Sequence, residues 1–200
     1  MGIPEAELTP KVRQAIASLM QEVDQLRRSV ENISERLATA EQLADQDPLL
    51  PIYNRRAFVR ELTRTQAFVE RYQIEASLVY IDLDKFKNVN DSYGHRAGDH
   101  VLQEFSMRLV AAIRDTDVVG RLGGDEFGLI LSRTNQKTAQ GLVNRLPQEL
   151  QNNPIIWNDA PLEIDMSYGI VTIEAGMDAQ DTMELADGKM YQHKNQQKKL

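Results

Sequence analysis

Two short acidic segments are the residues of this chain best suited to hold a metal ion. Asp82-Leu83-Asp84 ends a short apolar run, and Asp125-Glu126 follows the glycine pair Gly123-Gly124. Side chains alternate along a strand, so Asp82 and Asp84 face the same way. If the second segment lies beside the first, three or four carboxylates converge on one point, and Mg²⁺ prefers such oxygen ligands. A solvated acidic turn explains the same spacing equally well.

Phosphate is the group that the neighbouring residues would best accommodate. The two glycines remove side chains where a bulky ligand would approach the backbone. Lys87, Arg121 and Lys194 are candidate phosphate partners. The net charge of −7 argues against sequence-independent nucleic-acid binding, which needs a basic surface. It does not exclude a small phosphate-bearing substrate, because a divalent cation inverts the local charge.

The elements that must position these residues form an α+β arrangement. We expect Gly123-Gly124 to link two central strands in a hairpin and helices to cover the sheet faces. In the first helix of this part, Phe58, Leu62 and Phe68-Val69 would point inward, and Tyr53 would join Phe58 and Phe68 in the core. The expected helices span 55–72, 97–113, 139–150 and 182–194, and the expected strands span 77–82, 118–121, 127–131 and 164–173.

A heptad repeat precedes these elements. Between Val12 and Ala44, apolar residues recur at alternating intervals of four and three without Pro or Gly, which predicts a left-handed coiled coil. Facing g and e′ positions carry opposite charges, as at Glu22 and Arg27, which favours a parallel homodimer. The alternative is an amphipathic helix packed on its own domain, although this stripe is narrow for that role. The a positions are Ile16, Val23, Val30, Leu37 and Ala44, and the d positions are Val12, Leu19, Leu26, Ile33 and Ala40.

A break at Asp45-Gln46-Asp47-Pro48 separates the heptads from the rest of the chain. Proline and the residue before it disfavour helix, so we expect a dimerising coiled-coil helix over residues 1–46 and a second domain over 47–200. Cysteine is absent, which excludes disulfides, thiolate metal sites and a cysteine nucleophile. No stretch approaches the roughly 18 apolar residues of a membrane span. We therefore expect a soluble, cytoplasmic chain without a membrane segment.

The segment Arg121-Leu122-Gly123-Gly124-Asp125-Glu126-Phe127 resembles the motif that names the GGDEF family of diguanylate cyclases. The segment from Asp82 to Asp99 resembles the longer motif of that family, and Asp47-Pro48-Leu49 with Tyr53-Asn54-Arg55-Arg56 resembles its opening motif. The resemblance spans about residues 47–198. It implies a ferredoxin-like βαββαβ fold of the nucleotidyl-cyclase type, in which helices flank an antiparallel sheet.

The resemblance also implies an activity, in which two GTP molecules condense into cyclic di-GMP and two pyrophosphates. Asp82, Asp125 and Glu126 would be catalytic. Asn90 and Asp99 would read the guanine edge. The implied metal site for Mg²⁺ or Mn²⁺ consists of Asp82, Leu83, Asp125 and Glu126, and the other implied substrate-binding residues are Phe86, Lys87, Gly123, Gly124, Lys194 and Lys198.

A product-inhibition site is implied by the position of Arg114-Asp115-Thr116-Asp117. This R-x-x-D segment precedes the hairpin at the distance at which the family carries its inhibitory site. Arg114, Asp117 and, on the next helix, Arg145 would bind cyclic di-GMP as an allosteric ligand. An arginine that ends a helix, followed by an aspartate in a turn, is the simpler interpretation of these residues.

The chain departs from the family pattern in three places, and other functions stay open. Leu49-Leu50-Pro51-Ile52 stands where the family has Leu-Thr-Gly-Leu, Lys198 stands where it has an arginine, and Lys189 stands where a small residue is usual. The main alternative is a catalytically silent GGDEF domain that binds GTP or cyclic di-GMP as a signalling module. A cyclase that makes a mixed guanine–adenine dinucleotide and a coiled-coil scaffold are the remaining alternatives.

Overall fold

The computed structural model describes residues 9–197, except for the side chains of residues 35 and 37–43. Contacts within the chain divide it into two units, Met1–Ala44 and Asp45–Leu200. Within the described residues, the first unit is formed by one long helix, α1 (Pro10–Asp45), whose last residue already belongs to the second unit. None of the helices within residues 9–197 combines the length and the apolar composition that crossing a membrane requires.

Most of the described heptad side chains of α1 are exposed to solvent within the single chain, although Ile16 is half-buried. The exposed fraction is 46% for Val23, 59% for Leu26 and 62% for Val30. Leaving apolar side chains in water costs roughly 25 cal/mol for each Å². The stripe is therefore an apolar surface that the described residues of the single chain leave uncovered.

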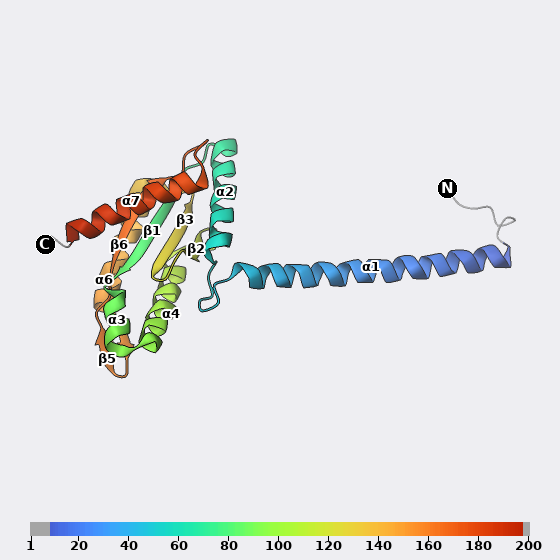
Figure 1. The fold of residues 1–200 in the computed structure, drawn as a ribbon. Helices are drawn as coiled ribbons and strands as arrows, with labels where there is room; N and C mark the ends of the chain where they lie inside the picture. Colours follow the sequence, from blue (N-terminus) through green and yellow to red (C-terminus); the bar gives the residue numbers. More distant parts are fainter. Residues whose placement is uncertain (1–8, 198–200) are drawn as a thin grey trace. The chain divides into compact units, whose positions relative to one another are not determined.

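A four-stranded antiparallel sheet forms the centre of the second unit, in the order β2-β3-β1-β6 (Figure 1). The register pairs Asp82 with Glu126 between β1 and β3, and Tyr80 with Gly169 between β1 and β6. This order is that of a ferredoxin-like βαββαβ fold, which confirms the predicted fold class. The strands are β1 (Ala76–Asp84), β2 (Val118–Arg121), β3 (Glu126–Ser132) and β6 (Asp165–Thr172).

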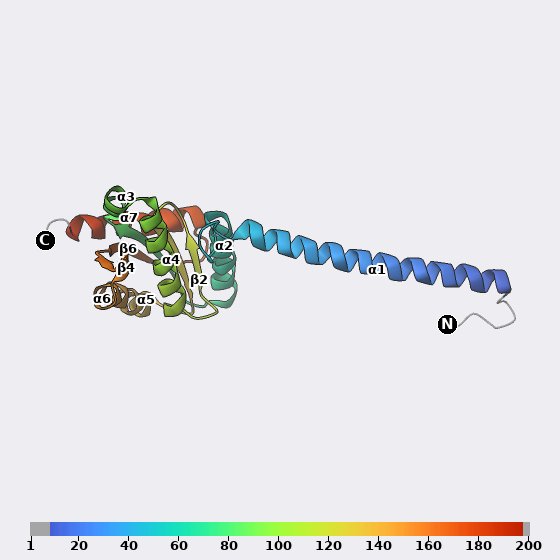
Figure 2. The same cartoon turned by 90° about the horizontal axis from the view of Figure 1, so that it is seen from below.

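Helices cover both faces of this sheet, as Figures 1 and 2 show. On one face, α2 (Arg55–Tyr72) and α7 (Ala179–Gln197) pack through Phe58, Leu62 and Met183. On the other face, α4 (His95–Ala112) packs through residues such as Phe105, whose ring meets that of Phe127 edge to face at 5.1 Å. Two separate cores therefore fix which side chains of each strand face α7 and which face α4.

Several elements differ from the prediction. The single helix expected over 139–150 is two helices, α5 (Gln136–Val143) and α6 (Arg145–Asn152), because Pro147 cannot donate the hydrogen bond that would join them. The helix α3 (Phe86–Tyr93) was not predicted, since Val89 is its only buried residue. Nor was a small hairpin of β4 (Ile155–Trp157) and β5 (Ala160–Leu162), whose two loop residues Asn158 and Asp159 have positive φ angles.

The prediction that Phe68 and Tyr53 belong to the core was wrong. Phe68 is 53% exposed and stacks on Tyr72 at 5.7 Å between ring centroids, on the outer side of α2. Tyr53 is 37% exposed. Phe58 is fully buried as expected, because Gly120 and Gly128 leave room for its ring against the sheet.

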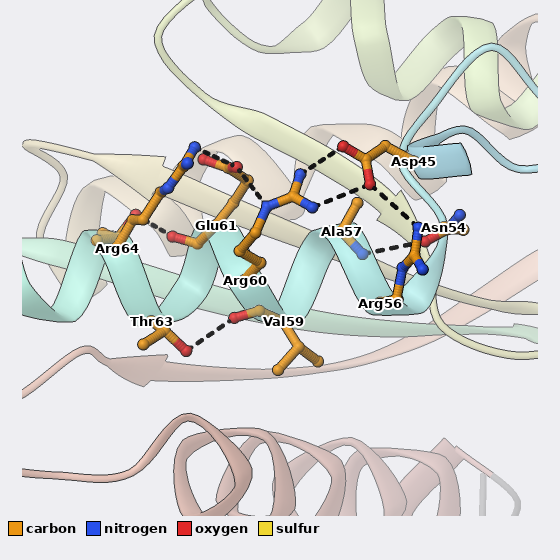
Figure 3. Close-up of polar contacts among 10 residues, drawn as sticks. Asp45, Asn54, Arg56, Ala57, Val59, Arg60, Glu61, Thr63 and Arg64 are labelled. Carbon is orange, nitrogen blue, oxygen red and sulfur yellow. Dashed lines mark hydrogen bonds and ion pairs between the residues drawn. The ribbon is translucent and has the colours of Figure 1, made fainter. Parts of the chain in front are cut away.

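A charged network runs along the outer side of α2, as Figure 3 shows. The Asn54 side chain caps the helix by accepting from the Ala57 amide at 3.0 Å. Arg60 donates to both carboxylate oxygens of Asp45, at 2.9 and 2.6 Å. This hydrogen bond is the main reason why the pKa of Asp45 is lowered. Arg64 and Glu61 extend the network by one ion pair of 2.9 Å.

Substitution of Gly169 by alanine is expected to destabilise the second unit by about 1–3 kcal/mol. A Cβ at this position of β6 would overlap the Ala186 carbonyl and the Met190 amide of α7. Chemical denaturation of Gly169→Ala measures the loss. Gly188→Ala, on α7, is the matched control, because its Cβ would meet nothing within 4 Å. The control should gain about 0.5–1 kcal/mol, and equal stability of the two variants would contradict the assigned contact.

Candidate active site

The pairing of β1 with β3 brings the two acidic segments together. Asp82 lies directly opposite Glu126 in the register, and the amide of Leu83 donates to the Asp125 carbonyl at 3.1 Å. Leu83 itself is buried in the α4-side core. It can therefore offer a cation only its backbone oxygen, whereas Asp82, Asp125 and Glu126 can offer carboxylates.

The glycine turn, residues 122–126, connects β2 to β3 beside these carboxylates. The Leu122 amide donates to the Glu126 carbonyl at 2.8 Å and closes the turn. A Cβ on Gly123 would overlap the carboxylate of Glu126, so the glycine is needed to keep that side chain in place. A Cβ on Gly124 would meet no atom within 4 Å. The described chain itself therefore does not require a glycine at position 124.

Lys194 of α7 reaches across to the carboxylates at the end of β1. Its ammonium donates a short hydrogen bond to Asp82 and lies 3.7 Å from an oxygen of Asp84. The hydroxyl of Ser167, on β6, donates to the other oxygen of Asp84 at 2.7 Å. Burial acts to lower the pKa of Lys194, but the hydrogen bond and charge of Asp82 raise it overall. Lys194 is therefore a cation at neutral pH.

Burial perturbs the acidic residues in the opposite sense. It raises the pKa of Asp125 above the ordinary value, and the charge of Asp82 raises it further. Burial is also the main reason why the pKa of Glu126 is raised, against the effect of a hydrogen bond from Tyr80. Burial and the charge of Glu126 raise the pKa of Tyr80 to about 12, so that Tyr80 stays protonated.

The donor set fits a hard divalent cation in chemical kind. Asp82, Asp125 and Glu126 supply only oxygen ligands, which suit Mg²⁺ and Mn²⁺. Among the side chains that the structure describes, no three His, Asp or Glu stand close enough together to form a ready metal site. A cation on Asp82 would compete with the Lys194 ammonium for the same oxygen.

The predicted guanine-reading residues lie on two consecutive helices, Asn90 on α3 and Asp99 on α4. A Cβ on Gly98 would overlap the Asn90 side-chain oxygen and would lie 3.1 Å from the ring of Phe86, so Asn90 packs directly over Gly98. Asp99 is the next residue along α4 and is exposed. Lys87 is exposed in the first turn of α3. Lys198 lies outside the described residues.

Arg121, a candidate phosphate partner, is hydrogen-bonded to the chain itself. Its Nε donates to the Gly123 carbonyl at 3.0 Å, and its Nη2 donates to the Gly124 carbonyl at 2.7 Å. Its Nη1 donates to Asp47 at 3.2 Å. This contact was not predicted from the sequence, and neither was that of Tyr80 with Glu126. The alternation that placed Asp82 and Asp84 on one face also includes Tyr80, so this signal was available.

The three predicted inhibitory residues lie away from the carboxylates. The carboxylate of Asp117 accepts from the Arg114 amide at 3.1 Å and from the Ser132 amide at 2.9 Å, so it stabilises the turn between α4 and β2. The side chain of Arg114 is exposed at the end of α4, and that of Arg145 is exposed at the start of α6.

Comparison with known proteins relates this geometry to a family. Residues 44–200 match the family described as "Diguanylate cyclase, GGDEF domain". The chain is 35% identical over 170 residues to the probable diguanylate cyclase DgcE of Escherichia coli, which covers 83% of this chain and 15% of DgcE. It is 30% identical over 190 residues to the diguanylate cyclase DgcP of Pseudomonas aeruginosa, which covers 95% of this chain and 28% of DgcP. The chain thus spans less than a third of either relative.

Solved structures show the same fold. The coiled coil and GGDEF domain of DgcB from Caulobacter crescentus, in complex with c-di-GMP, superposes with a TM-score of 0.79 at 26% identity, over 89% of this chain and 95% of that one. Diguanylate cyclase SiaD from Pseudomonas aeruginosa, in complex with its activator SiaC, gives 0.72 at 28% identity, over 92% and 75%. With the family match covering the whole second unit, the chain belongs to the GGDEF-domain diguanylate cyclase family.

Proposed function

We propose that this chain condenses two GTP molecules into cyclic di-GMP and two pyrophosphates, as a homodimer that uses Mg²⁺ or Mn²⁺. The observation that carries the proposal is the placement of Asp82 directly opposite Glu126, with Asp125 beside it at the glycine turn. Relatives named as diguanylate cyclases support it. So does the likeness to a GGDEF domain solved with c-di-GMP.

The reaction requires a ribose 3′-hydroxyl to attack the α-phosphorus of a second GTP while pyrophosphate leaves. Asp82, Asp125 and Glu126, with the Leu83 carbonyl, would hold the cation. When bound, it lowers the pKa of the attacking hydroxyl and neutralises charge on the phosphate. Glu126, next to Asp125 at the glycine turn, would also help to take the hydroxyl proton.

Other residues would bind and orient the GTP. Asn90, which packs over Gly98, and Asp99, the next residue after Gly98, would read the guanine edge. The backbone at Phe86 begins α3, and the start of a helix favours phosphate oxygens. Lys87, Lys194 and Lys198 would add positive charge for the β- and γ-phosphates, while Gly123 and Gly124 let the substrate approach the backbone.

Two copies are needed because each globular domain would present one GTP. The exposed heptad stripe of α1 supports a parallel coiled coil between them. We assign residues 1–46 to this dimerising segment and residues 47–200 to the cyclase domain. Joining two half-sites on one rod raises their effective concentration, so the coil is part of the proposed mechanism.

Cyclic di-GMP would also inhibit its own formation by binding at a second site. Arg114, Asp117 and Arg145 would bind cyclic di-GMP, since an arginine fork suits a phosphate or a guanine edge. The exposed guanidinium groups of Arg114 and Arg145 support this assignment. Asp117 already accepts two backbone amides, so in this site it would also fix the turn that presents Arg114.

Removing one acidic charge tests the catalytic assignment. Asp125→Asn and Glu126→Gln are each expected to lower cyclic di-GMP formation from GTP and Mg²⁺ by about a thousandfold, because each keeps the side-chain shape but weakens the cation site. Chromatography of the nucleotide products measures the rate. Glu163→Gln, in the loop after β5, is the control and should keep full activity. A wild-type chain that binds GTP without turnover would favour the silent signalling module instead.

The Asp125→Asn variant should be more stable than the wild type when no cation is bound. The pKa of Asp125 is raised in the folded state, so the protonated carboxyl favours folding. This contribution to the free energy of unfolding is fully present below the unfolded pKa and is lost as pH rises through the folded pKa. The melting temperature of Asp125→Asn in EDTA should therefore exceed that of wild type near neutral pH. The difference should vanish below about pH 4, and a gap that stays constant with pH would contradict the assigned shift.

Light scattering tests the dimer. The intact chain should have the mass of two copies at micromolar concentration, and Leu19→Glu with Leu26→Glu should give a monomer, because two d positions then place charge in the interface. Turnover should fall with the dimer fraction. Gln21→Glu, on the solvent side of the same helix, is the matched control. A wild-type monomer would remove the coiled-coil assignment.

Arg114→Ala tests the inhibitory site. The concentration of cyclic di-GMP that halves the rate should rise about tenfold to a hundredfold, which is the effect of losing one charge-assisted hydrogen bond. The initial rate without product should stay the same. Lys137→Ala, on the exposed side of α5, controls for general loss of positive charge. An unchanged inhibition curve in Arg114→Ala would disprove the assignment.

A further inference from the structure

We propose that Arg121 is a positioning residue, oriented by Asp47, that turns the Gly123–Gly124 peptide so that the Gly124 N–H can donate to a phosphate oxygen of the bound nucleotide. The inference rests on the proposed function, since it assumes that a nucleotide binds beside the carboxylates. It adds one backbone contact and two residues that never touch the substrate.

Arg121 holds the glycine turn through three hydrogen bonds to peptide oxygens. The guanidinium donates from Nε to the Gly123 carbonyl at 3.0 Å and to the Gly124 carbonyl at 3.2 Å, and from Nη2 to the Gly124 carbonyl at 2.7 Å. Two successive peptide oxygens are therefore directed at one rigid, planar cation. A lysine could supply the charge but could not make these three contacts at once.

Asp47 orients the Arg121 side chain. Its Nη1 lies 3.2 Å from the carboxylate of Asp47, and the two side chains are only 18% and 10% exposed. The same carboxylate accepts from the Leu49 amide at 3.0 Å and from the Leu50 amide at 3.1 Å. Leu50 is buried in the core. Asp47 is thus fixed by its own turn, and it holds the far end of the guanidinium.

The hydrogen bonds of Arg121 also determine the direction in which the Gly124 N–H points. In a trans peptide unit the N–H points opposite to the C=O. The Gly123 carbonyl points toward Arg121, so the N–H of Gly124 points away from it. Arg121 pairs with Phe127, whose ring lies in the α4-side core, whereas Glu126 and Asp82 form a pair whose side chains lie on the α7 side. The Gly124 N–H therefore faces the carboxylate side of the turn.

The space beside Gly124 is open. A Cβ there would meet no atom of the chain within 4 Å, and the backbone is not in the left-handed region, so the fold tolerates alanine at this position. A ligand can approach this backbone closely. A fixed N–H donor aimed at the place where negative charge develops stabilises a transition state because it needs no reorganisation.

Three variants test the inference. Arg121→Lys should lower kcat about tenfold to a hundredfold while the KM for GTP changes much less, and Asp47→Asn should give a smaller loss in the same direction. Gly124→Ala should lower kcat while leaving the melting temperature within about two degrees of wild type. Arg64→Lys, in the ion pair on the outer side of α2, is the matched control for Arg121→Lys and should behave as wild type.

An NMR titration supplies a readout that does not depend on turnover. In protein labelled with ¹⁵N-glycine, the Gly124 amide resonance should move when 3′-deoxy-GTP and Mg²⁺ are added, since this nucleotide binds but cannot condense. The shift should be lost in Arg121→Lys. A Gly124 resonance that does not respond to nucleotide, or an Arg121→Lys variant with wild-type kcat, would overturn the inference. A chain that shows the shift but makes no cyclic di-GMP would refute the proposed function and leave this inference standing.

Discussion

Antiparallel pairing between β1 and β3 determines where each acidic side chain of the site can lie. A slip of one residue would send Asp82 and Glu126 to opposite faces of the sheet. The register is fixed by apolar residues, because Ile81 and Leu129 belong to the α4-side core while Leu78 and Ile130 belong to the α7-side core. A slip of one strand would turn its apolar side chains toward the opposite core and disrupt the packing of both. The hydrophobic core therefore specifies the geometry of the polar site.

That geometry has an energetic cost at the site itself. Burial raises the pKa values of Asp125 and Glu126, so their ionised forms are destabilised relative to water. The same burial places them where a cation and a phosphate would find a low dielectric constant and strong electrostatic interactions. Lys194 compensates part of the negative charge through its bond to Asp82. The rest of the fold, with its two apolar layers, supplies the stability that the site lacks.

The central strands, most helices and the glycine hairpin could be predicted from the sequence, because each has a clear apolar period or turn signal. The helix α3 could not, since a polar segment with only Val89 buried shows no stripe. Phe68 was misassigned because apolar spacing on α2 does not reveal which of two adjacent positions meets the sheet. Motif residues identified the site, but the partner of Arg121 depends on a tertiary contact with Asp47, which local patterns do not encode.

The segment between the long helix and α2 also closes one side of the sheet. Tyr53 donates from its amide to the Val119 carbonyl at 3.2 Å and accepts from the Arg121 amide at 2.8 Å, so it pairs with β2 as a short parallel strand would. Unpaired strand edges recruit other chains and lead to aggregation. A shortened protein that begins after Asn54 would expose unpaired N–H and C=O groups along β2. Aggregation or altered association of such a protein in solution would therefore result from the exposed strand edge and would not show the effect of removing the long helix.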